Sequence, residues 1–251
     1  MSLPTFVYDL DTVLAGGRPE LPETTGVLDG AEGKHAATVK RIEVGERMLL
    51  IDGHGSGIEV TATATSKSAV TFSVDKRVSF PARPAVTIVQ ALPKSERSEL
   101  AVDLMTQGGV DVIVPWQASR SIAKWGAKAE KAVAKWRSMA VSASKQSRRM
   151  YIPEVTELAT TQQVIELIAE HTGRGGLAVM LHEEAAVAFT SLDFGEQEVL
   201  FVVGPEGGLA PDEVAAFGEA GAVTALLGPE VLRTASAGLV ALAAHGALAR
   251  W

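Results

Sequence analysis

A short glycine loop that occurs twice constrains this chain more than any other feature. The first copy follows the apolar run Phe201-Val202-Val203 and reads Gly204-Pro205-Glu206-Gly207-Gly208. The second follows Ala225-Leu226-Leu227 and reads Gly228-Pro229-Glu230, and a helical pattern comes after each loop. Strand, glycine loop and helix in this order are typical of an open α/β sheet, in which ligands bind at the carboxyl ends of the strands.

The residues of the first loop indicate what kind of ligand it could hold. Glycine lets a ligand approach the backbone closely, and Pro205 stiffens the turn. Pro211 then opens a helix, and Asp212 and Glu213 in its first turn suit the positive end of the helix dipole. Because these carboxylates already occupy that field, a flat neutral group such as an adenine ring is favoured over a phosphate. A single loop of this kind is usually an ordinary turn, but two such loops favour a ligand site.

Composition limits the possible classes of protein. The 251 residues allow one large or two small domains, and a hydrophobic content of 47% is ample for a core. The absence of cysteine excludes disulfides, thiolate metal sites and cysteine catalysis. His182-Glu183-Glu184 lacks the second histidine of an H-E-x-x-H site, so no metal is expected. With no apolar run long enough to span a membrane and no signal pattern, we expect a cytoplasmic protein.

One segment is strongly basic in a chain that is otherwise acidic. The net charge is −7, yet residues 118–150 carry nine basic side chains and one acidic side chain. Such a segment can hold an anionic polymer, and the Arg148-Arg149 pair favours RNA. The alternative is a solvated amphipathic helix, because the lysines of the segment recur at helical spacing. Trp125 and Trp136 are more typical of core anchors than of base-stacking platforms.

The hydrophobic pattern changes near residue 79. Before this point, short alternating runs separated by turn residues predict a small antiparallel β domain, with a barrel as the expected form. These runs lie at 47–51, 57–62 and 69–74. The glycine-rich stretch 53–57 resembles a nucleotide-binding pattern, but strands flank it on both sides, so it is interpreted as a hairpin loop.

After a predicted linker at 80–84, strands alternate with helices. The predicted strands are 86–91, 110–114, 177–181, 199–203 and 223–227, and the predicted helices lie near 96–107, 161–171 and 237–249. This alternation implies a mostly parallel sheet. The chain is therefore divided into a β domain, residues 1–78, and an α/β domain, residues 79–251.

Taken together, these motifs resemble the SPOUT superfamily and, within it, the ribosomal RNA small subunit methyltransferase E family. The resemblance rests on V-G-P-E-G-G-L-x-x-x-E at residues 203–213 together with L-G-P-x-V-L-R-T at residues 227–234. An early element that begins at His35, the Lys94-Ser95-Glu96-Arg97 segment and a Q-x-x-R element before Ile152-Pro153-Glu154 support it. The resemblance extends over nearly the whole chain.

The resemblance implies a specific fold and a specific reaction. The N-terminal domain is expected to be a PUA-like β-barrel that helps to hold RNA, and the α/β domain is expected to end in a deep trefoil knot. Members are homodimers with the terminal helix in the interface. The implied reaction is the transfer of a methyl group from S-adenosyl-L-methionine to N3 of a uridine in 16S ribosomal RNA of the small ribosomal subunit. The implied cofactor-binding residues are Leu181, His182, Gly204, Glu206, Gly207, Gly208, Leu227, Gly228, Leu232, Arg233 and Thr234.

The proposed chemistry requires few side chains. Methyl transfer from a sulfonium needs in-line positioning and no metal. The uridine N3 must lose its proton, and a cation beside the cofactor could stabilise the resulting anion, which makes Arg233 the candidate catalytic residue. The alternative role for Arg233 is to brace its loop. The candidate phosphate contacts, which would position RNA, are Lys40, Arg41, Lys94, Arg97, Arg120, Arg148 and Arg149.

Several charged positions depart from the family pattern. Ala235-Ser236 follow the L-R-T motif where Glu-Thr is usual, and Glu230 stands where arginine is usual. Leu104 and Gln107 replace a usual lysine and glutamate. Two alternative functions therefore stay open. One is a ribose 2′-O methyltransferase, which the absence of an S-L-N-V segment disfavours, and the other is an RNA-binding ribosome assembly factor without catalysis.

Overall fold

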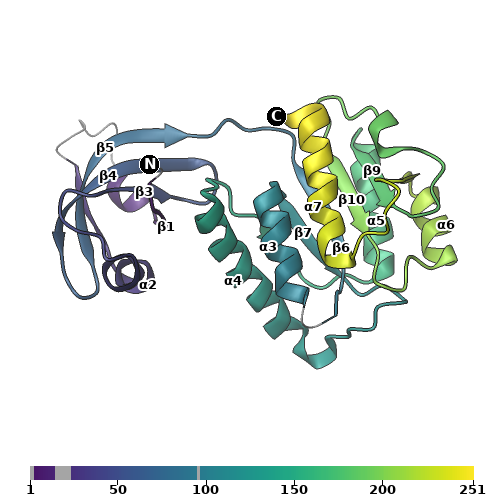
Figure 1. Ribbon diagram of the computed structural model, residues 1–251, viewed down its shortest axis with the longest axis horizontal. Helices are drawn as coiled ribbons and strands as arrows, with labels where there is room; N and C mark the ends of the chain where they lie inside the picture. Colours follow the sequence, from purple (N-terminus) through teal and green to yellow (C-terminus); the bar gives the residue numbers. More distant parts are fainter. Residues whose placement is uncertain (1–2, 15–23, 95–96) are drawn as a thin grey trace. The chain divides into compact units, whose positions relative to one another are not determined.

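The computed structural model describes residues 3–14, 24–94 and 97–251, which form two compact units (Figure 1). The first unit comprises Met1–Ala82 together with Ser144–Ile152, and the second comprises Arg83–Ala143 together with Pro153–Trp251. The sequence pattern placed the boundary at 78/79, whereas the first unit extends to Ala82 and includes a later segment of the chain. Each unit is built around its own sheet.

The first unit contains a five-stranded sheet in the order β1-β3-β4-β5-β2. Its strands are β1 (Thr5–Val7), β2 (Thr25–Leu28), β3 (Arg47–Ile51), β4 (Ser56–Thr65) and β5 (Val70–Ser79). Short helices lie at α1 (Asp11–Leu14), α2 (Gly30–Lys34) and a π-helix, His35–Lys40. The prediction of a fully antiparallel domain is wrong for β1, which pairs parallel to β3 because the chain runs through α1, β2 and α2 before it returns in the same direction. The other pairs are antiparallel, around a core that includes Phe6, Met48 and Phe72.

The glycine-rich stretch between β3 and β4 is a hairpin loop, as expected. The later segment of the first unit, residues 144–152, is hydrogen-bonded to this loop. The amide of Gly55 donates to the carbonyl of Met150 at 3.1 Å, and the amide of Ile152 donates to the carbonyl of Gly53 at 2.9 Å. Gly55 has a φ of 98°, and a Cβ there would lie 2.4 Å from the ring of Tyr151. These glycines therefore make room for a neighbouring chain segment and not for a nucleotide.

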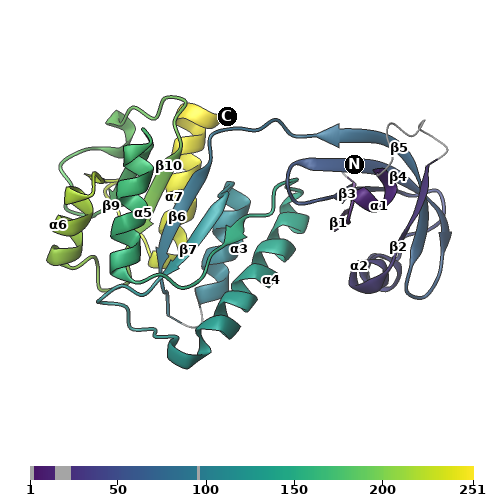
Figure 2. The ribbon, with the colours of Figure 1, turned by 180° about the vertical axis from the view of Figure 1, so that it is seen from behind.

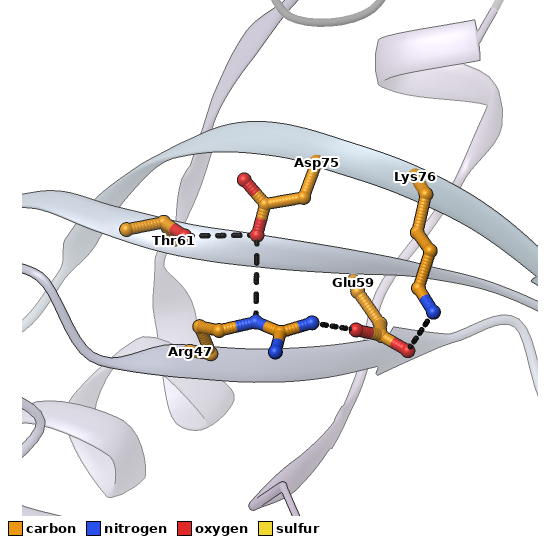
Figure 3. A network of polar contacts seen from close by, with 5 residues as sticks. All are labelled: Arg47, Glu59, Thr61, Asp75 and Lys76. Carbon is orange, nitrogen blue, oxygen red and sulfur yellow. Dashed lines mark hydrogen bonds and ion pairs between the residues drawn. The ribbon is translucent and has the colours of Figure 1, made fainter.

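A polar network crosses β3, β4 and β5 (Figure 3). Arg47 pairs with Glu59, which also accepts an ion pair from Lys76 Nζ at 2.9 Å. Thr61 Oγ1 donates to Asp75 Oδ2 at 2.8 Å, and this carboxylate lies 3.9 Å from Arg47 Nε. Such exposed pairs contribute little stability. Both cations of the network, Arg47 and Lys76, already have anionic partners in the sheet, which reduces the net positive charge of this region.

The second unit contains a parallel six-stranded sheet in the order β11-β9-β10-β6-β7-β8, which confirms the predicted α/β class. The strands are β6 (Val86–Ala91), β7 (Val112–Trp116), β8 (Glu154–Val155), β9 (Leu177–Leu181), β10 (Val199–Val203) and β11 (Val223–Ala225). The helices are α3 (Ser98–Gly108), α4 (Ala129–Ser147, whose residues up to Ala143 belong to this unit), α5 (Thr161–Gly173), α6 (Pro211–Glu219) and α7 (Thr234–His245), which continues as a π-helix, Gly246–Arg250.

Helices cover both faces of this sheet. Residues of α3, α4 and α7 pack on one face, whereas α5 and α6 pack on the other, and α5 lies in front of the strands in Figure 2. Successive residues of β10 alternate between the two cores, so that Phe201 belongs to the first and Val202 to the second. Burial on both faces explains why the strands read as continuous apolar runs. None of the described helices is long and apolar enough to cross a bilayer.

The basic segment is only partly helical. Lys124 precedes the helical part, and Lys128 ends a 3₁₀ turn, so the predicted lysine spacing applies to α4 alone. Trp136 is 1% exposed, and its indole nitrogen donates to Ser98 Oγ at 2.8 Å. Trp125 packs against it edge to face, with ring centres 5.1 Å apart. The interpretation of the tryptophans as core anchors is therefore confirmed for Trp136.

Candidate active site

A pocket of about 920 Å³ lies at the carboxyl edge of the parallel sheet. Both glycine loops line it, because each leaves the carboxyl end of a strand, β10 for the first loop and β11 for the second. Every residue that the sequence assigned to the cofactor lines this one pocket. Three of the candidate RNA contacts line it as well, namely Lys94, Arg97 and Arg120. The other four, Lys40, Arg41, Arg148 and Arg149, belong to the first unit.

The first loop, Gly204–Leu209, is bonded to neighbouring loops at several points. Arg120 Nη1 donates to the carbonyls of Gly207 and Leu209 at 3.3 and 3.2 Å. The carboxylate of Glu206 accepts the backbone amide of Lys94 at 3.1 Å, which ties the loop after β6 to the glycine loop. Arg120, expected as a phosphate contact, thus has a partner inside the site.

The second loop, residues 227–233, is open by comparison. Within the part of the chain that the structure describes, residues 227–232 make no hydrogen bond, and Val231 is 76% exposed. The loop ends at Arg233, whose carbonyl accepts the amides of Ser236 and Ala237 at 2.9 and 3.0 Å and so begins α7. The guanidinium of Arg233 is exposed and has no hydrogen-bond or ion-pair partner among the described residues.

One ring nitrogen of a histidine in the pocket is engaged by the backbone. His182 follows β9, and its Nδ1 accepts the backbone amide of Glu184 at 3.1 Å. The neutral ring therefore carries its proton on Nε2. The backbone of His182 is held in turn, because its amide donates to the carbonyl of Ala225 at 3.1 Å. His182 thus lines the pocket on a stretch of backbone that is held by a hydrogen bond.

A carboxylate whose burial the sequence did not indicate lies beneath the first loop. Glu213 and Asp212 both lie in the first turn of α6, as the sequence indicated, but only Asp212 is exposed. Glu213 is 3% exposed and is turned into the protein, where it accepts hydrogen bonds from Ser119, Thr161 and Ala210. A local sequence signal for one of these contacts is the position of Glu213, three residues after Ala210 at the start of α6.

Comparison with known proteins identifies the family. Residues 81–246 match the model of an RNA methyltransferase domain. The ribosomal RNA small subunit methyltransferase E of Mycobacterium tuberculosis (strain CDC 1551 / Oshkosh) is 45% identical over 237 residues, which cover 92% of this chain and 90% of the relative. The chain belongs to the ribosomal RNA small subunit methyltransferase E family. The Bacillus subtilis (strain 168) member is 30% identical, with 86% of this chain and 88% of the relative covered.

Solved structures share the fold of this family member over its whole length. A ribosomal RNA small subunit methyltransferase E from Neisseria gonorrhoeae bound to S-adenosyl methionine superimposes with a TM-score of 0.84 at 22% identity, covering 98% of each chain. A methyltransferase from Legionella pneumophila in complex with the same cofactor gives 0.83 at 23% identity, covering 99% of each chain. At this level of identity the likeness concerns the fold.

Proposed function

We propose that this protein transfers the methyl group of S-adenosyl-L-methionine to N3 of a uridine in the 16S ribosomal RNA of the small ribosomal subunit. The observation that carries the proposal is the single pocket formed by both glycine loops in a chain of the ribosomal RNA small subunit methyltransferase E family. The relatives named above are small-subunit RNA methyltransferases, and two structures with the same fold hold S-adenosylmethionine.

The residues of the pocket fit this cofactor. A volume of about 920 Å³ lies in the range of small-molecule sites. Gly228 faces open space, since a Cβ there would meet only Glu230 Oε2, at 3.8 Å. The two loops would hold the cofactor largely through backbone groups, with His182 Nε2 as a side-chain donor. When bound, S-adenosylmethionine supplies a methyl group on a positively charged sulfur, for which no metal is needed.

The catalytic role falls to Arg233 in this proposal. Loss of the N3 proton leaves the uracil ring with a negative charge on its two oxygens, and a cation aimed at that charge lowers the barrier. Arg233 lines the pocket and has no competing partner among the described residues, whereas Arg120 is bonded to two carbonyls of the first loop. These contacts support Arg233 as the group that stabilises the uracil anion.

The candidate RNA contacts fall into two groups. Lys94 and Arg97 line the pocket, where they would contact phosphates that flank the target nucleotide. Lys40, Arg41, Arg148 and Arg149 would hold more distant parts of the RNA through the first unit. Arg41 and Arg148 have φ values of 54° and 58°, a conformation that glycine or asparagine adopts more easily. The presence of arginine at two such positions supports a role for the side chain.

The finer features of the fold are part of the same proposal. We assign the first unit as a PUA-like β-barrel and the second as a SPOUT domain with a C-terminal trefoil knot, on the basis of family membership. A homodimer with the terminal helix in its interface is supported by two exposed apolar residues at the end of the chain, Leu248 at 49% and Trp251 at 77%. Sedimentation of the wild type beside an L248E/W251E variant tests the dimer.

Calorimetric titration with S-adenosylmethionine is the first experiment. We expect binding by the wild type and none by a G207W variant, because a side chain at this position meets Arg120, with a Cβ contact of 3.3 Å. Methyl transfer is then assayed on naked 16S RNA and on small subunits that lack the modification, with nucleosides identified by mass spectrometry. A 3-methyluridine product supports the proposal. A 2′-O-methylated nucleoside would replace it with ribose methylation, and RNA binding without any methyl transfer would replace it with an assembly factor.

A further inference from the structure

We propose that Glu213 is a positioning residue, and that its buried carboxylate holds the first glycine loop in its binding conformation before the cofactor arrives. Oε1 accepts the amide of Ser119 at 2.8 Å and the hydroxyl of Thr161 at 3.2 Å, and Oε2 accepts the amide of Ala210 at 3.1 Å. These donors lie in three separate connections of the α/β unit, after β7, at the start of α5 and before α6. The proposal rests on the proposed function, since it concerns the same cofactor site.

The burial of this carboxylate makes the three contacts interdependent. Glu213 is 3% exposed and forms no ion pair with any residue that the structure describes. A buried carboxylate without a counter-ion is stable only when donors satisfy its oxygens, so the loss of any one contact leaves charge uncompensated. The field at the start of α6 adds to this stabilisation. The loops that supply the donors therefore cannot move apart independently.

The network is anchored in the core on one side. Thr161 Oγ1, while donating to Glu213, accepts a hydrogen bond from the indole nitrogen of Trp116 at 3.2 Å. Trp116 is the last residue of β7 and is fully buried, with its ring edge to face against Phe217 of α6 at 5.3 Å. The carboxylate of Glu213 is thereby linked, through Thr161, to the end of an inner strand of the sheet.

On the other side the network reaches the glycine loop. Ser119 precedes Arg120, which donates to the carbonyls of Gly207 and Leu209. Ala210 directly follows Leu209. Glu213 thus fixes both the segment that carries the bracing arginine and the end of the loop that the arginine braces. A role limited to the start of its own helix would explain only the contact with Ala210.

The test compares E213Q with a control substitution in the same helix layer, away from the pocket. The glutamine can still accept one pair of donors, but its NH₂ group must face another N–H, so one contact is lost. Thr172 Oγ1 lies 3.0 Å from the carbonyl of Ala220, near the C-terminal ends of α5 and α6, and also within reach of the carbonyls of Ile168 and Ala169 in its own helix at 2.9 and 3.3 Å, and Thr172→Val removes this donor. It therefore weakens the same helix layer away from the pocket. Thr161→Val is the second variant, used if E213Q does not fold.

Two measurements are made well below the melting temperature of each variant. Hydrogen exchange of the peptides that span residues 117–121 and 204–210 is measured without cofactor, and the Kd and KM for S-adenosylmethionine are measured beside kcat. We expect E213Q to accelerate exchange in both segments and to raise Kd and KM about tenfold, with kcat at saturating cofactor nearly unchanged. T172V should lower the melting temperature without these changes.

Two results would overturn the inference. One is wild-type exchange in both segments of E213Q, and the other is a Kd in E213Q that is no weaker than in T172V. The exchange experiment needs no cofactor, so it decides the role of Glu213 even if the wild type fails to bind S-adenosylmethionine, a failure that would count against the proposed function alone.

Discussion

The two Gly-Pro-Glu loops begin with the same three residues but are held in different ways. The first is bonded to Arg120 through two carbonyls and to Lys94 through its glutamate, and it ends beside a buried carboxylate. In the second, residues 227–232 make no hydrogen bond within the described part of the chain, and Glu230 is exposed. The loops line one pocket, yet among the described residues only the first is held by hydrogen bonds to neighbouring loops.

This difference indicates a division of labour within the site. A loop that is already ordered binds a ligand without a further loss of conformational entropy, which suits the cofactor. A loop with an unbonded backbone and a free cation can adjust to a second substrate. We infer that the first loop mainly determines cofactor affinity and that the second loop mainly determines the rate of methyl transfer.

The largest effect is expected for the free arginine of the second loop. Arg233→Ala should lower kcat by about 10²–10³-fold, the usual cost of removing one group that stabilises developing charge, while the Kd for S-adenosylmethionine stays close to that of the wild type. Single-turnover methyl transfer and calorimetry measure the two quantities. Arg233→Lys keeps the charge and should recover part of the rate. A loss of cofactor affinity equal to the loss of rate would mean that Arg233 braces the loop.

The bracing arginine of the first loop should behave in the opposite way. Arg120→Ala removes two charge-assisted hydrogen bonds to the loop and should raise the Kd for S-adenosylmethionine about tenfold. At saturating cofactor, kcat should change little. Lys124→Ala removes another exposed cation from the same connection and serves as the control. Equal effects of the two substitutions on Kd would contradict the bracing role.

Acid should weaken the helix that follows the second loop. Burial, with Arg250 and Arg83 nearby, lowers the pKa of His245 in α7 from 6.5 to about 4. The folded protein thus favours the neutral ring. The contribution of His245 to the stability of the folded state is therefore complete above pH 6.5 and is lost as the pH falls toward 4. The free energy of unfolding should fall with a slope approaching about 1.4 kcal/mol per pH unit in this range.

Thermal melts at a series of pH values measure this dependence. The ring of His245 packs against Phe194, with centres 4.9 Å apart, so His245→Phe is a suitable non-titrating variant. It should flatten the pH dependence between 6.5 and 4. An unchanged slope in the variant would assign the acid sensitivity to other groups.

The smallest effect concerns the glycines themselves. Gly208 in the first loop has a φ of 71°, so Gly208→Ala should cost about 1 kcal/mol of stability. Gly228 in the second loop has no positive φ and faces open space, so Gly228→Ala should change stability by less than about 0.5 kcal/mol. Urea unfolding of the two variants measures the contrast. A larger cost at Gly228 would show that the second loop is more constrained than its contacts indicate.

Several sequence predictions were confirmed because they depend on local pattern. Continuous apolar runs are what a strand buried on both faces requires, and β6, β9 and β10 lie where the runs predicted them. The glycine loops were found because glycine and proline act through the backbone at their own positions. Parallel strands then bring their carboxyl ends to one edge, which is why all the cofactor candidates line a single pocket.

The sequence by itself thus determined the α/β class, the family and the residues around the pocket. Only the tertiary structure decided which neighbours in the protein those residues contact. It turned Glu213 inward, bonded Arg120 to the first loop and left the guanidinium of Arg233 without a partner among the described residues. The physical reason is the distance along the chain between partners. Glu213 meets Ser119 across 94 residues, and Glu206 meets Lys94 across 112, so no local pattern specifies either contact.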